Sequence, residues 1–139
     1  MALQVLQPLP DVIGAVGAAL RPGGRLVATV PSADALTLHD RVRWLCLIAA
    51  LRSRLRHPND DLLGDLARLL GEAGMDLAGD EHRRFALPMR GQPDARLLVM
   101  SLYLPEVDEE ARAHAVDVAT AWEGDIGICI RRILAVRPA

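Results

Sequence analysis

The chain has 139 residues, of which 51% are hydrophobic and 24% are charged. This composition excludes a disordered tail and a collagen-like fibre, and the length suits a single domain with its own core, over residues 1–139. The formal net charge of −2 lacks the basic excess that nucleic-acid-binding proteins usually carry. We therefore expect no nucleic-acid partner.

Neither a membrane span nor a metal site is visible in the sequence. The longest apolar run, from Trp44 to Leu51, is far shorter than the ~18 residues that a span needs. The first residues lack the charged and apolar regions of a secretory signal. The two cysteines, Cys46 and Cys129, do not have metal-site spacing. These features predict a reduced cytoplasmic protein with no membrane partner and no bound metal.

The first predicted elements are a helix and a strand. Asp11 is a suitable N-cap, and apolar residues recur at helical spacing as far as Leu20. The proline and glycines of residues 21–24 would end this helix. The continuous apolar run that follows predicts a buried strand over about 25–31.

Two helical regions come next. Residues 35–57 are expected to be helical, in one or two pieces. Their arginines, between Arg41 and Arg56, either bind an anionic substrate or form a solvated face. Residues 60–74 predict a second helix, since carboxylates follow a proline at its start and Gly74 is a suitable residue just beyond its end.

The remaining elements alternate between strands and helices. Residues 77–87 predict a strand, and the apolar run 96–104 fits a helix or a strand equally well. Carboxylates at 108–110 begin another predicted helix. Isoleucines then alternate with other residues, which predicts a last strand over about 126–136.

The most distinctive motifs are Gln-Val-Leu-Gln-Pro-Leu-Pro-Asp at 4–11 and Leu-Arg-Pro-Gly-Gly-Arg-Leu-Val at 20–27. They resemble the end of the fourth strand, the fourth helix and the start of the fifth strand of class I S-adenosylmethionine-dependent methyltransferases. The order of the later elements is also similar. The resemblance implies a partial Rossmann-like α/β fold: a three-stranded mixed sheet with flanking helices, and a helical lid insertion over 35–57.

Several features of that family have no counterpart in the sequence. The family binds its cofactor with a glycine-rich loop after the first strand and an acidic residue after the second. Here the adjacent glycines, Gly23 and Gly24, lie in a different turn. Pro8 replaces a histidine that is common in the family, and Ala18 replaces a usual arginine. The resemblance therefore covers the C-terminal half of a methyltransferase.

This resemblance implies a conditional function. The chain would be the substrate-side part of a protein that transfers a methyl group from S-adenosylmethionine to a small molecule, if the cofactor-binding half is supplied. The alternative is a non-catalytic dimerising or protein-interaction module derived from that fold. In the family the fourth strand lies beside the fifth, so the fifth would here be an open sheet edge. We expect a homodimer or a complementary chain to pair at this edge.

The resemblance also places three residues near the adenosyl or methionyl part of the cofactor. These are Leu3, Gln4 and Gln7. The alternative is that this terminal segment frays and binds nothing.

Three further residues are candidates for lining a substrate pocket. Ser32 follows the strand 25–31 at its carboxyl end, where α/β sheets bind ligands, or it caps the next helix. Trp44 and Tyr103 supply aromatic contact area to a pocket, or they fill the core.

No catalytic constellation is recognisable from spacing. His39-Asp40 and His57 are the candidates for acid–base chemistry, and surface or capping roles are the alternative. His82 and His114 are isolated. The carboxylates at 60–61 and 108–110 are explained by the helix dipole, because each group begins a predicted helix.

Overall fold

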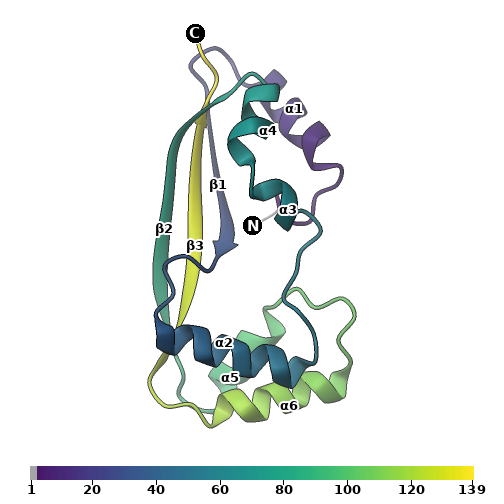
Figure 1. Cartoon of the computed structure of the whole chain (residues 1–139), viewed down its shortest axis with the longest axis vertical. Coiled ribbons are helices and arrows are strands. Elements are labelled where there is room, and N and C mark those ends of the chain that lie inside the picture. Colours follow the sequence, from purple (N-terminus) through teal and green to yellow (C-terminus); the bar gives the residue numbers. More distant parts are fainter. Residues whose placement is uncertain (1–2) are drawn as a thin grey trace. The chain divides into compact units, whose positions relative to one another are not determined.

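The computed structural model describes residues 3–139, which form an α/β structure. Figure 1 shows the helices and strands of this part of the chain. The helices are α1 (Leu9–Ala19), α2 (Leu38–Leu51), α3 (Asp60–Leu63), α4 (Leu66–Glu72), α5 (Gln92–Met100) and α6 (Glu109–Thr120), and the strands are β1 (Arg25–Ser32), β2 (Asp76–Pro88) and β3 (Asp125–Val136).

The three strands form one antiparallel sheet in the order β1-β3-β2. Backbone hydrogen bonds join Arg137, after β3, to Gly23 and Gly24, before β1. The N–H of Met89, after β2, donates to the carbonyl of Gly124, before β3, at 2.8 Å. The central strand therefore runs against both neighbours, and the predicted mixed sheet is wrong because no parallel pair exists among these strands. The predicted strand ranges agree with the observed ones to within one residue at each end.

The chain divides into two compact units, each with its own hydrophobic core. Among the described residues, unit 1 comprises 3–32, 56–83 and 130–139, and unit 2 comprises 33–55 and 84–129. Both β2 and β3 contribute one part to each unit. The helix α2 occupies the middle of the predicted insertion 35–57 and belongs to unit 2.

The core of unit 1 lies where α1, α3 and α4 pack with the strands. Its fully buried side chains include Leu9, Ile13, Leu70 and Ile133. The helix α1 approaches the end of α4 closely, because Gly17 has no side chain. A Cβ atom at Gly17 would overlap the backbone carbonyl of Ala73.

The helix ends of unit 1 differ in part from prediction. Asp11 was expected to be the N-cap of the first helix, but α1 begins at Leu9 and Asp11 lies within its first turn. Pro8 occupies the N-cap position with an extended backbone, and Pro10 lies in the first turn, where a backbone N–H has no partner within the helix. The single helix predicted over 60–74 is divided into α3 and α4, which are separated by Gly64 and Asp65.

The predicted role of Gly74 at the end of α4 is confirmed. Gly74 has a φ of +70°, a left-handed conformation that favours glycine. Its N–H donates to the carbonyl of Gly71, and the N–H of Met75 donates to that of Leu70 at 2.9 Å. This pair of bonds is a Schellman motif, which satisfies carbonyls at the helix end and turns the chain into β2.

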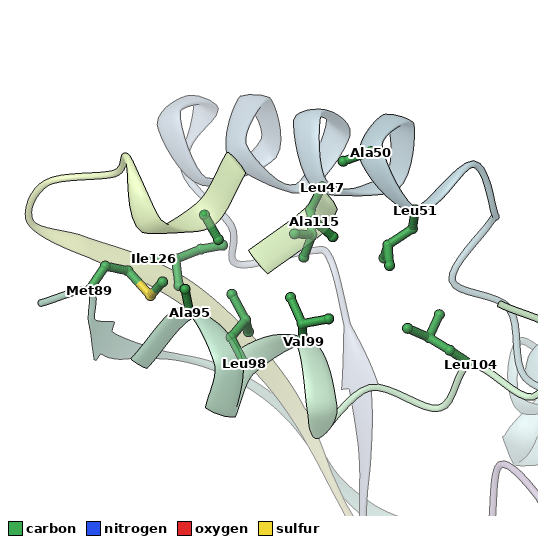
Figure 2. Close-up of a cluster of buried hydrophobic side chains, with 11 residues drawn as sticks. Leu47, Ala50, Leu51, Met89, Ala95, Leu98, Val99, Leu104, Ala115 and Ile126 are labelled. Carbon is green, nitrogen blue, oxygen red and sulfur yellow. The ribbon is translucent and has the colours of Figure 1, made fainter. Parts of the chain in front are cut away.

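The core of unit 2 brings together three helices, as Figure 2 shows. Leu47 and Leu51 of α2 lie near Leu98 and Val99 of α5, and Ala115 of α6 lies beside them. The apolar run 96–104, which fitted a helix or a strand equally well, begins within α5 and ends in the loop beyond it.

No helix in the described residues is long and apolar enough to cross a membrane.

We expect Gly17→Ala to lower the free energy of unfolding by about 1–3 kcal/mol, because the added methyl forces α1 away from the Ala73 carbonyl. Gly14→Ala is the matched control on the same helix, since a Cβ atom there meets nothing within 4 Å. That change should be neutral or stabilising by up to ~1 kcal/mol. Urea unfolding of both variants measures the difference, and equal effects would contradict the close approach.

Candidate functional site

The three residues predicted near a cofactor lie in the loop before α1. The side chain of Asn59 is buried and donates to the backbone carbonyls of Leu3 and Leu6, both at 2.7 Å. Its backbone N–H donates to the carbonyl of Gln4 at 3.1 Å. One buried amide thus fixes the loop, so the segment from Leu3 to Leu6 is anchored at three carbonyls.

This loop borders an open depression of about 370 Å³. Gln7 lines it, whereas Gln4 is buried. The other lining residues are Pro8, Leu9, Pro10, Pro58, Asn59 and Leu62. The described lining offers no carboxylate to accept from ribose hydroxyls and no glycine loop for close backbone approach. These residues alone therefore do not fit S-adenosylmethionine.

Polar side chains gather at the carboxyl end of β1, in what we call the Ser32 cluster: Ser32, Asp80, His82 and Arg131. Ser32 Oγ lies 2.9 Å from His82 Nδ1, and His82 Nε2 lies 3.6 Å from Asp80 Oδ1. All four residues belong to unit 1 and come from three strands. The structure thus joins Ser32, a predicted site residue, to a histidine that looked isolated in the sequence.

Arg131 fixes the acidic member of the Ser32 cluster. Its Nε and Nη2 donate to the two carboxylate oxygens of Asp80 at 2.8 and 2.6 Å, and its Nη1 donates to the carbonyl of Leu63 at 2.9 Å. The Arg131 bonds lower the pKa of Asp80 below its usual value of 3.8, although partial burial acts in the opposite direction. Asp80 therefore remains a charged carboxylate beside His82 at neutral pH.

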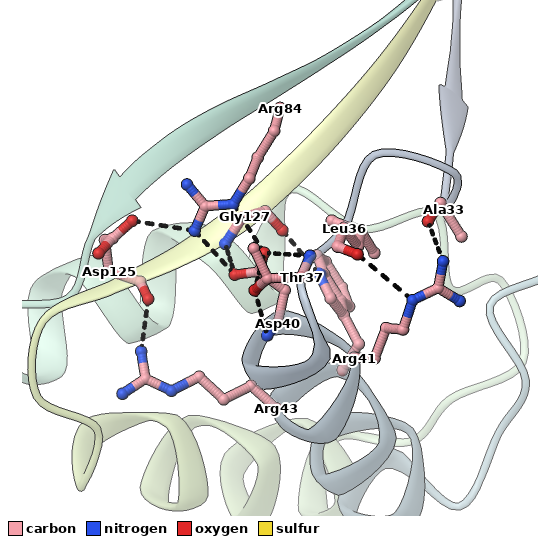
Figure 3. Close-up of polar contacts among 10 residues, drawn as sticks. Ala33, Leu36, Thr37, Asp40, Arg41, Arg43, Arg84, Asp125 and Gly127 are labelled. Atoms are coloured by element: carbon pink, nitrogen blue, oxygen red, sulfur yellow. Dashed lines mark hydrogen bonds and ion pairs between the residues drawn. The ribbon is translucent and has the colours of Figure 1, made fainter.

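The pair His39-Asp40 does not form the acid–base site that was considered for it. His39 is exposed, whereas Asp40 is completely buried in unit 2. The Asp40 carboxylate accepts from the N–H and Oγ1 of Thr37 at 2.9 and 2.7 Å, and from Nε and Nη2 of Arg84 at 2.7 and 2.9 Å (Figure 3). A fifth donor is the N–H of Gly127 at 2.6 Å. Asp40 is a structural anchor because its oxygens are already saturated with donors.

Trp44, predicted to line a substrate pocket or to fill the core, has a structural role in this region. Its Nε1 donates to the carbonyl of Gly127 at 2.8 Å, and its ring packs against the core of unit 2. The N–H and the carbonyl of Gly127 are thus hydrogen-bonded to Asp40 and Trp44 of α2. A Cβ atom at position 127 would overlap the Asp40 carboxylate, so only glycine fits there.

The remaining candidates are dispersed. Tyr103 is exposed and lies in unit 2, whereas Ser32 lies in unit 1. His57 lies 3.4 Å from Asp60, just before α3. The helix predicted to begin at the carboxylates 108–110 is α6, and the carboxylate of Asp108 caps it by accepting from the N–H of Ala111 at 2.7 Å.

The arginines between 41 and 56 do not converge on a substrate-binding set. Arg41 donates to the carbonyl of Ala33 at 2.9 Å, and Arg43 donates to that of Asp125 at 2.6 Å. Arg56 pairs with Asp61 at 2.9 Å. Among the described residues, no group of three histidine, cysteine or acidic side chains is placed to hold a metal ion.

Sequence reasoning missed Asp80, His82 and Arg131 because their partners are about 50 residues away along the chain. One signal was present: Asp80 and His82 are two residues apart on a predicted strand, so their side chains share a face.

The sequence matches no protein-family model, and no curated protein is significantly similar to it.

We expect Asp40→Asn to reduce the free energy of unfolding at pH 7 by ~3–5 kcal/mol, because Arg84 and Gly127 lose a charged acceptor in a buried place. The bonds from Arg84 and then those from Thr37 and Gly127 hold the pKa of Asp40 well below its usual 3.8, against the effect of burial. Its contribution is therefore complete above about pH 5 and is lost as the pH falls further.

Urea unfolding at pH 7 and pH 3 tests this assignment. The original protein should lose much more stability at pH 3 than the Asp40→Asn variant does. Asp117→Asn, on the exposed face of α6, is the control and should preserve the acid sensitivity. An unchanged acid sensitivity in the Asp40 variant would show that another group is responsible.

Proposed function

We propose that these residues form the C-terminal, substrate-side part of an S-adenosylmethionine-dependent methyltransferase-like protein that methylates a small molecule. The strand order β1-β3-β2 carries the proposal. The resemblance of residues 4–32 implies that β1, β2 and β3 correspond to the fifth, sixth and seventh strands of that fold, and these would lie in the order fifth, seventh, sixth. The last strand along the chain lies between the other two, as this correspondence requires.

The position of the Ser32 cluster supports the same assignment. Ser32 is the last residue of β1, and α/β sheets bind their ligands beyond the carboxyl ends of their strands. In a methyl transfer much of the rate comes from holding the acceptor in line with the methyl donor. The polar groups at this end of β1 would position the acceptor.

The described residues do not fit the cofactor alone, so its binding requires a complementary half. We place that half at the outer edge of β1, because β1 has a single neighbour among the described strands. An edge strand presents unpaired backbone groups to another strand. Val27 on β1 is 61% exposed, which leaves an apolar side chain for the partner to cover. The partner is a second copy or a complementary chain.

A second candidate function is a non-catalytic dimerising or protein-interaction module. The observation that favours it is an exposed apolar stripe on α2. Leu38, Val42 and Leu45 recur at helical spacing and are 79%, 51% and 64% exposed. This stripe lies on the side of α2 opposite to the buried Leu47 and Ala50, so one helix has two apolar faces.

Two valine substitutions distinguish these surfaces. A lysine at an edge strand prevents strand pairing, so Val27→Lys should convert the assembled protein to monomers. Val42→Lys places the same charge on the stripe of α2 and should leave the assembly intact. Light scattering at micromolar concentration gives the mass of each variant. An intact assembly in Val27→Lys together with monomers in Val42→Lys would favour the interaction module. A monomeric original protein would contradict pairing of copies at β1.

Calorimetric titration with S-adenosylhomocysteine tests the methyltransferase assignment itself. We expect micromolar binding by the assembled protein and none by the Val27→Lys monomer, because neither half holds the cofactor alone. Ser101→Lys, at an exposed position after α5, is the control for added charge and should bind like the original protein. An absence of binding by the assembled protein at millimolar ligand would contradict the proposal for the homodimer.

A further inference from the structure

We propose that Ser32 is an activated nucleophile that accepts an acyl group from small ester substrates, with His82 as its general base. This goes beyond the proposed methyl transfer and does not depend on it. The carrying observation is the distance of 2.9 Å between Ser32 Oγ and His82 Nδ1, with the Asp80 carboxylate on the opposite side of the ring. A nucleophile within reach of a base that a third group orients is the general signature of such sites.

The charge next to the ring decides which nitrogen accepts. Asp80 Oδ1 lies 3.6 Å from Nε2, a distance at which the attraction is electrostatic. The anion favours the tautomer with its proton on Nε2, because a positive N–H dipole then faces the carboxylate. Nδ1 is left as the acceptor for the Ser32 hydroxyl. In the serine proteases Nε2 faces the serine and Nδ1 faces the aspartate, so the two nitrogens are reversed here. Either nitrogen of the ring can take a proton.

The surroundings keep the cluster rigid but accessible. Arg131 holds Asp80 with two bonds and is itself bonded to the carbonyl of Leu63, so the carboxylate cannot swing away. The His82 side chain is 28% exposed and Ser32 is partly exposed. A small ester can therefore approach from solvent.

The reaction has two balanced steps. Ser32 Oγ forms a bond to the carbonyl carbon of the ester while its proton passes to His82 Nδ1, and the alcohol leaves with that proton. Water then attacks the acyl-serine, gives a proton to His82, and releases the acid as Ser32 recovers its proton. No oxidant, reductant or metal takes part in either step.

The other two serines of the chain are internal controls. Ser101 Oγ donates to the carbonyl of Leu98 at 2.8 Å, and Ser53 Oγ donates to that of Arg54 at 3.4 Å. Neither of these two bonds involves a base. We expect a fluorophosphonate probe, followed by peptide mass spectrometry, to label Ser32 at least about tenfold faster than Ser53 or Ser101.

His82→Gln should slow the labelling of Ser32 by about 100-fold, whereas His39→Gln, at an exposed position on α2, should not change it. Circular dichroism verifies that each variant is folded. If His82→Gln does not fold, hydrolysis of p-nitrophenyl acetate is measured instead, with Ser32→Ala as the test variant and Ser53→Ala as the control. Ser32→Ala should lose the hydrolytic activity, and Ser53→Ala should keep it. Labelling of all three serines at one rate, or hydrolysis that survives Ser32→Ala, would overturn the proposal.

Discussion

The buried carboxylate of Asp40 is the interaction on which the arrangement of unit 2 depends. A charge that is removed from water destabilises the fold unless donors surround it. Here the donors come from the start of α2, from β2 and from β3, which are far apart in the sequence. The same carboxylate therefore fixes where α2 meets the sheet. It also explains why position 127 is glycine, since a side chain there would occupy the place of the carboxylate.

Strand β2 uses its polar residues in a similar way in unit 1. Asp80 is engaged by Arg131 of β3, and His82 is engaged by Ser32 of β1. These bonds cross the sheet on one face. Arg132 of β3 and Glu81 of β2, each one residue further along its strand than Arg131 and Asp80, form another ion pair. The charged residues of β2, which weaken its sequence pattern as a strand, are thus accommodated by specific partners. Ser32, His82 and Asp80 are also the nucleophile, the base and the orienting carboxylate of the proposed acyl transfer.

The proposed functions rest on different parts of the molecule. The methyltransferase assignment depends on the strand order and on the resemblance of residues 4–32, and the interaction module depends on the exposed stripe of α2. The reactive serine depends on the geometry of four side chains. The Ser32 cluster is shared by the methyltransferase assignment and the reactive serine, but cofactor binding and ester hydrolysis test the two separately. The methyltransferase and the interaction module both require a partner, which would pair at the edge of β1 in the first case and at the stripe of α2 in the second.

The sequence by itself determined the elements with strong local patterns. The strands at 25–31 and 126–136 were predictable because β-rich apolar residues are bounded by turn residues, and Gly74 was predictable because a left-handed helix end favours glycine. The strand at 77–87 was also predicted, although its glycine and charges weaken the pattern. Residues 96–104 could not be assigned, since a short apolar run fits both periods; the first five of them belong to α5, which packs against α6, and the rest lie in the following loop. Only the tertiary structure showed that Asp40 is an anchor and that His82 meets Ser32. These roles depend on contacts between residues about 40 to 90 positions apart, and no local spacing records them.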